Sequence, residues 1–169
     1  LIKTNIERLH SDIEDAISGL NSEQMHWVPS KHFNHIAFNL WHYVRTEDNL
    51  VRFVIQERRP TIWIEQDWYS KFNLDRISQG TGMTMDEANS LQISSIDQFG
   101  EYMTEVWQST TEYLSNASES DLEKQFVVRP FGERSSAQII MESLLTHGFT
   151  HVGEMLMLKR LQGISFESF

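Results

Sequence analysis

The chain has 169 residues, of which 40% are apolar and 22% charged, with a formal net charge of −10 and no cysteine. This length favours one domain, so we expect residues 1–169 to fold together as a single unit. The lack of cysteine excludes disulfides, thiolate metal ligands and a cysteine nucleophile. The negative charge opposes binding to nucleic acids and to anionic membranes. No apolar run is long enough to predict a membrane span, and we expect a cytoplasmic protein.

Two helices are predicted in the first third of the chain. Apolar residues recur at spacings of three and four over residues 1–20, which indicates an amphipathic helix. A second helix is predicted over about 35–57, with Asn34 as its N-cap. It ends at Arg59, because a residue that precedes proline avoids the helical conformation. Residues 60–83 lack a clear period, and a loop of this length is usually functional or partly structured.

Two further helices are predicted in the second half. Thr84 and Glu87 form a capping box that opens a helix to about residue 115. Residues 116–134 are predicted as a second long connection, polar from Asn116 to Glu123, with a short extended piece at 126–128 before the sequence RPFG at 129–132. Ser135 and Gln138 form a second capping box, which opens a helix over 136–162. The pattern predicts an all-α fold, a four-helix bundle whose long connections permit a topology other than simple up-and-down.

The last predicted helix carries a candidate metal-binding pair. His147 and His151 lie four residues apart, so their side chains share one face of the helix. Two imidazole nitrogens placed in this way can reach one metal ion at about 2.0–2.1 Å. Gly148 and Gly153 interrupt the same helix, and a costly helical glycine often marks the close approach of another backbone or a ligand. The alternative is a pair of partly buried, hydrogen-bonded histidines.

The second predicted helix offers a third ligand. His42 and His35 lie on nearly the same face but two turns apart, so only one of them can readily meet a metal held by the last helix. Three neutral imidazoles with open coordination positions would bind a divalent metal such as zinc or nickel. No acidic residue directly follows His147, which disfavours a metalloprotease.

Several segments resemble the DinB-like superfamily of helical metalloproteins. The sequence NHIAFNLWHYVRTED at 34–48 is similar to the family's second-helix signature, and HGFTHVGE at 147–154, followed by LQG at 161–163, resembles its last-helix signature. Residues 62–72 and 84–87 are similar to the region between them. The likeness therefore spans most of the chain.

The resemblance implies a four-helix bundle of DinB-like type, often a homodimer, with a divalent metal held by His42, His147 and His151. His42 is preferred over His35 because the family's histidine follows an apolar pair and precedes an Arg-Thr-Glu-Asp-like stretch. Relatives include S-transferases that use bacillithiol or mycothiol, and a maleylpyruvate isomerase. The resemblance thus implies a small-molecule substrate and a low-molecular-weight thiol. The family's damage-inducible name does not imply DNA binding.

Four other residues are candidates for the site. Glu154 could orient a ligand or act as a base, and Arg45 could grip an anionic substrate, although a solvated carboxylate and a surface ion pair are the simpler interpretations. Trp63 and Trp68 are candidates for a pocket wall, with burial in the core as the alternative. We expect a metal-dependent transferase or hydrolase. The alternative is a non-catalytic metal- or ligand-binding bundle, and a metal-free interaction module is a weaker third interpretation.

Overall fold

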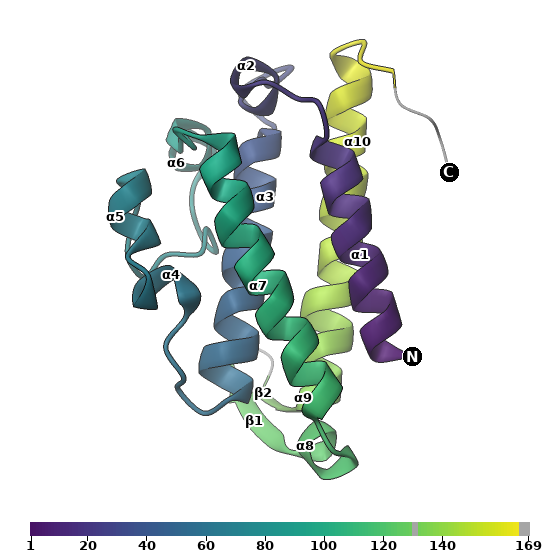
Figure 1. The fold of residues 1–169 in the computed structure, drawn as a ribbon. Helices are drawn as coiled ribbons and strands as arrows, with labels where there is room; N and C mark the ends of the chain where they lie inside the picture. Colours follow the sequence, from purple (N-terminus) through teal and green to yellow (C-terminus); the bar gives the residue numbers. More distant parts are fainter. Residues whose placement is uncertain (130–131, 166–169) are drawn as a thin grey trace.

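The structure, a computed structural model, describes residues 1–129 and 132–165 and is mainly helical (Figure 1). The Pro130-Phe131 part of the predicted connection and the last four residues lie outside the described residues. The helices are α1 (Ile2–Ile17), α2 (Ser22–Met25), α3 (Ile36–Asp48), α4 (Ile62–Glu65), α5 (Trp68–Phe72), α6 (Met85–Ser90), α7 (Ile96–Asn116), α8 (Glu119–Glu123), α9 (Ser136–Gln138) and α10 (His147–Leu161). Two π-helical segments, η1 (Asn49–Ile55) and η2 (Ile139–Thr146), extend α3 and precede α10.

The long helices pack side by side. Helix α1 contacts α7 and α10, and α3 contacts the same two helices. Helices α3 and α7 run in the same direction, because the long connection between them returns the chain to the end at which α3 begins (Figure 1). The all-α prediction is therefore confirmed, and the chain adopts one of the orders other than up-and-down that its long connections permit. Among the described residues, no helix has the length and apolarity needed to cross a bilayer. The single-domain assignment and the homodimer stay predictions.

Helix boundaries follow local capping chemistry. Both predicted capping boxes are present, Thr84 with Glu87 and Ser135 with Gln138. The predicted continuous helix over 84–115 is wrong, because α6 ends at Ser90 and α7 begins at Ile96. The residues between them include Leu91 and Ile93, whose side chains are buried in the core. The free energy gained by burying these two apolar side chains outweighs the free energy that a continuous helix would gain.

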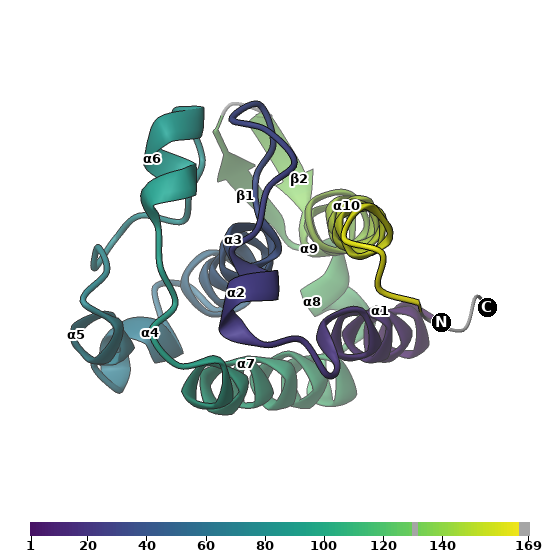
Figure 2. The same cartoon turned by 90° about the horizontal axis from the view of Figure 1, so that it is seen from above.

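A small antiparallel sheet was not predicted. Strands β1 (Gln125–Val128) and β2 (Gly132–Ser135) pair with Gln125 opposite Ser135 and Val128 opposite Gly132. Only the extended piece at 126–128 was expected from sequence, because the alternating pattern in four residues is too short to be distinctive. Figure 2 shows this hairpin and α6 on the outer side of α3 and α10, away from α1 and α7.

A buried carboxylate fixes α3 against α1 and α7. Glu47 is fully buried and accepts hydrogen bonds from Tyr43 Oη at 2.7 Å and Thr110 Oγ1 at 2.6 Å. His10 Nε2 of α1 donates to the same carboxylate at 3.0 Å, and its ring stacks on Trp107. Because a buried carboxylate without partners is very costly, these contacts select one arrangement of the three helices.

The two glycines of α10 serve different purposes. A Cβ atom at Gly148 would lie 2.5 Å from Leu9 Cδ2 and 2.7 Å from Tyr43 Cε2, whereas a Cβ at Gly153 would meet no atom within 4 Å. The predicted close approach is therefore present at Gly148, where it is made by side chains of α1 and α3. At Gly153 it is absent.

We therefore expect opposite effects from alanine at these glycines. Gly148→Ala forces Leu9 and Tyr43 apart and should lower the free energy of unfolding by about 1–3 kcal/mol. Gly153→Ala should leave it unchanged or raise it by up to about 1 kcal/mol, because alanine is the better helix former. Urea denaturation measures both, and equal effects of the two substitutions would contradict this account of the packing.

Candidate metal centre

Three histidine rings converge where α3 faces α10. His42 of α3 places its Nε2 atom 3.2 Å from Nε2 of His147, and His151 Nε2 lies 2.8 Å from the same atom. One ligand atom from each of the three lies within 4.8 Å of the others. Two nitrogens bound at about 2.0–2.1 Å to one cation lie roughly 2.9–3.4 Å apart, depending on the coordination angle. The spacing of these rings thus suits a shared cation.

In two of the rings the other nitrogen faces an acceptor. The backbone carbonyl of Gln79 accepts from His42 Nδ1, and a carboxylate oxygen of Glu154 accepts from His151 Nδ1 at 2.8 Å. An acceptor at Nδ1 favours the tautomer that leaves an unprotonated Nε2. His42 and His151 therefore turn Nε2 lone pairs toward Nε2 of His147, and a cation between the three nitrogens would bind these lone pairs.

Burial keeps the rings of His147 and His42 neutral. Burial, together with the neighbouring rings of His151 and His42, lowers the pKa of His147 to about 4. Burial is also the main cause of the lowered pKa of His42. The hydrogen bond from His151 lowers the pKa of Glu154, which is therefore ionised. Neutral imidazoles backed by acceptors form a donor set that fits a divalent cation of the zinc or nickel type.

The histidines open onto a cavity of about 820 Å³. Its walls come from α3, η1, the 79–88 region, β1 and η2, and the apolar part is formed by Phe38, Leu50, Val54, Met83, Met85, Ala88, Val127 and Val128. Among the described lining residues, the charged side chains other than histidine are Arg129 and Glu142, and Glu142 pairs with Arg134 at 3.3 Å. The cavity therefore suits a small, largely apolar molecule.

Glu154 orients a histidine. It bonds His151 from the side opposite the other rings and does not line the main cavity. Of the two roles expected for it, the geometry matches the orientation of a ligand and leaves it poorly placed as a base for a molecule in the cavity.

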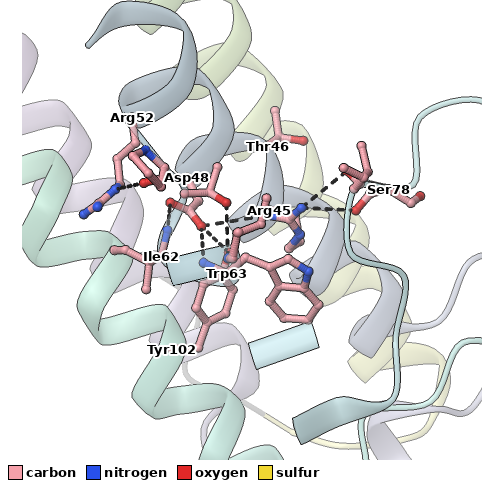
Figure 3. Close-up of polar contacts among 12 residues, drawn as sticks. Arg45, Thr46, Asp48, Arg52, Ile62, Trp63, Ser78 and Tyr102 are labelled. Carbon is pink, nitrogen blue, oxygen red and sulfur yellow. Dashed lines mark hydrogen bonds and ion pairs between the residues drawn. The ribbon is translucent and has the colours of Figure 1, made fainter. Parts of the chain in front are cut away.

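Arg45 lies in the interior rather than in the cavity. It is 1% exposed, its Nη1 atom lies 3.8 Å from Asp48, and its guanidinium stacks over Trp63 (Figure 3). Asp48 in turn accepts from the backbone amides of Ile62 and Trp63 and from Tyr102. The prediction that Arg45 binds an anionic substrate is therefore corrected, because its guanidinium is buried and does not line the cavity.

The two loop tryptophans are also core residues. Trp63 is fully buried and Trp68 is 3% exposed, and both contact the ring of Tyr102. Neither lines the cavity at the histidines. The assignment of Trp63 and Trp68 to a pocket wall is therefore corrected. Their side chains pack against α7, away from the cavity.

His35 caps the start of α3. It is the N-cap of α3, where its Nδ1 atom accepts from the backbone amide of Phe38 at 2.9 Å, and it lies beside His26 with ring centroids 5.0 Å apart. The expected cap, Asn34, is one residue too early. His35 is not part of the histidine cluster, which agrees with the preference for His42.

The buried His35 predicts a pH dependence of stability. Burial, and secondarily the nearby His26, lower the pKa of His35 from 6.5 to about 4. Between these values the unfolded chain binds a proton that the folded chain does not, so stability is lost as the pH falls from about 6.5 to 4. His35→Asn keeps a capping side chain but cannot titrate in this range. The free energy of unfolding of this variant should therefore fall less between pH 6.5 and pH 4 than that of the wild type, by at most about 3 kcal/mol.

Urea denaturation of both proteins between pH 7 and pH 4 tests this expectation. The wild-type and variant stabilities should converge as the pH falls. Parallel curves would show that the titration of His35 does not contribute.

Comparison with known proteins agrees with the architecture. A solved structure described as a conserved protein from Enterococcus faecalis superposes with a TM-score of 0.80 at 19% sequence identity, covering 95% of this chain and 94% of that one. This likeness concerns the fold alone. None of the curated proteins matches the chain. The sequence profile of the DinB superfamily matches residues 5–155, so this chain belongs to the DinB superfamily.

Proposed function

We propose that this protein is a divalent-metal-dependent enzyme that acts on a small molecule, with His42, His147 and His151 as the metal ligands. The observation that carries the proposal is the convergence of three Nε2 atoms, with spacings of 2.8 and 3.2 Å to His147, beside a cavity of about 820 Å³. Membership of the DinB superfamily agrees with it. Zinc and nickel are among the ions that imidazole ligands suit.

The reaction class that suits this site best is transfer to a low-molecular-weight thiol. A bound divalent cation would supply Lewis acidity, which lowers the pKa of a thiol or a water at an open coordination position. The chain itself orients His42 through the Gln79 carbonyl and His151 through Glu154, and the apolar walls of the cavity would contact the body of the electrophile. The sulfur would attack an electrophilic carbon, the leaving group would depart with its electron pair, and the thiol proton would pass to solvent.

A non-catalytic metal- or ligand-binding protein is the second candidate. One observation favours it: among the described residues that line the cavity, the only carboxylate is Glu142, which is already paired with Arg134. The described lining of this cavity therefore offers no unpaired carboxylate as a general acid or base. Thiol transfer needs less proton chemistry from the protein, because the cation itself favours the thiolate.

Metal binding is the first test. Protein purified without a nickel column and stripped with a chelator should bind one equivalent of zinc or nickel. His42→Ala and His147→Ala should each weaken binding at least ~100-fold, since each removes one of three ligands. His35→Asn is the matched control, because this buried histidine lies on the same helix but outside the cluster. Competition with a chromophoric chelator gives the affinities, and unchanged binding by His42→Ala would refute the ligand assignment.

Turnover separates the two functional candidates. Metal-loaded protein should accelerate conjugation of monochlorobimane to bacillithiol or mycothiol, measured by fluorescence, and the acceleration should disappear with His147→Ala or after chelation. Metal binding without acceleration with either thiol would favour the non-catalytic candidate. Release of a hydrolysis product from an ester substrate without any thiol would favour a hydrolase.

A further inference from the structure

The segment 75–80 presents three successive backbone carbonyls to α3. The carbonyls of Ile77 and Ser78 accept hydrogen bonds from Arg45 Nη2, both at 3.4 Å, and the next carbonyl, that of Gln79, accepts from His42 Nδ1. Arg45 and His42 are three residues apart on one helix, so they lie on neighbouring positions of the same face. One short segment is thereby fastened to a buried guanidinium and to a candidate metal ligand.

The guanidinium of Arg45, which contacts this segment, is itself positioned by buried neighbours. Arg45 lies 4.7 Å from the ring centre of Trp63 and 3.8 Å from the Asp48 carboxylate, which is itself anchored by the amide of Ile62 at 2.9 Å and by Tyr102 Oη at 2.9 Å. Figure 3 shows these groups together, with the dashed contacts from Arg45 reaching the chain at Ser78. Displacing a buried charge from its partners is costly, so Arg45 Nη2 restricts where the carbonyls of Ile77 and Ser78 can lie.

Contacts within the segment 75–80 also determine its backbone conformation. Asp75 Oδ1 accepts from the backbone amides of Ile77 at 2.7 Å and Ser78 at 2.5 Å. Gly80 has a φ of +91°, and a Cβ there would lie 3.1 Å from His42 Nδ1. Glycine is therefore needed where the segment turns over the imidazole. Both ends of the segment thus fix the position of the Gln79 carbonyl.

We propose that Arg45 is a positioning residue for the metal centre. By holding the segment 75–80, it places the Gln79 carbonyl where His42 must carry its proton on Nδ1 and turn an unprotonated Nε2 toward His147 and His151. The proposal rests on the function proposed above, because it treats His42 as a metal ligand. Loss of an outer partner of this kind typically weakens metal binding by about 10–100-fold.

Three variants test this role. Arg45→Gln removes the guanidinium, and Asp75→Ala loosens the same segment from an exposed position that does not endanger the fold. Arg52→Gln is the matched control. Arg52 is also buried, on the same continuous helical segment, and also fastens a loop, by donating to the Pro60 carbonyl and to Glu65, but it makes no contact with the segment 75–80.

Two measurements are made on each protein: zinc affinity by chelator competition, and the tautomer of His42 in the metal-free protein by ¹⁵N–¹H correlation spectra of the imidazole. Arg45→Gln should weaken zinc binding about 10-fold or more, and Asp75→Ala by a few-fold. In both, His42 should lose its single Nδ1–H tautomer. Arg52→Gln should lower stability and leave both readouts as in the wild type.

The proposal is overturned if Arg45→Gln and Asp75→Ala keep the wild-type affinity and tautomer, or if Arg52→Gln weakens zinc binding as much as Arg45→Gln. If Arg45→Gln does not fold, Asp75→Ala decides. Failure of the wild-type protein to bind zinc would refute the proposed metal function instead, while the tautomer in metal-free protein would still test the role of Arg45.

Discussion

Three imidazole nitrogens face one another across the contact between α3 and α10. Hydrogen bonds to the Gln79 carbonyl and the Glu154 carboxylate engage the outer nitrogens of His42 and His151 and favour the tautomers with unprotonated inner nitrogens. Burial and the neighbouring rings lower the pKa of His147 to about 4, so this ring is neutral at neutral pH. The rest of the fold must hold these nitrogens together, and a cation between them would bind their lone pairs.

Much of that support runs through α3. Toward α1 and α7, Glu47 gathers hydrogen bonds from Tyr43, Thr110 and His10. Toward the long connection, Arg45 and Asp48 hold the chain from Ile62 to Ser78. Helix α3 therefore carries buried charges on two sides, and each charge needs its partners in place because an unpaired buried charge is costly. Between these anchors, His42 has little freedom to leave the other two rings.

The cavity beside the histidines decides what chemistry is reasonable. Its walls are largely apolar, and the described side chains that line it include few charged groups. A site of this kind selects a molecule by shape rather than by ion pairs with it. These walls suit a molecule with an apolar body, and the cavity offers little to a reaction that needs a protein base.

The helical class, both capping boxes and the shared face of His147 and His151 could be predicted from the amino-acid sequence, because they follow from residues three or four positions apart. Family resemblance singled out His42. Long-range packing places Arg45 and Trp63 in the interior, puts π-helical turns before His147, and brings the Gln79 carbonyl to His42 across 37 positions of chain. A backbone carbonyl is common to every residue type. Its place is set by the path of a loop, which depends on distant packing that no local pattern encodes.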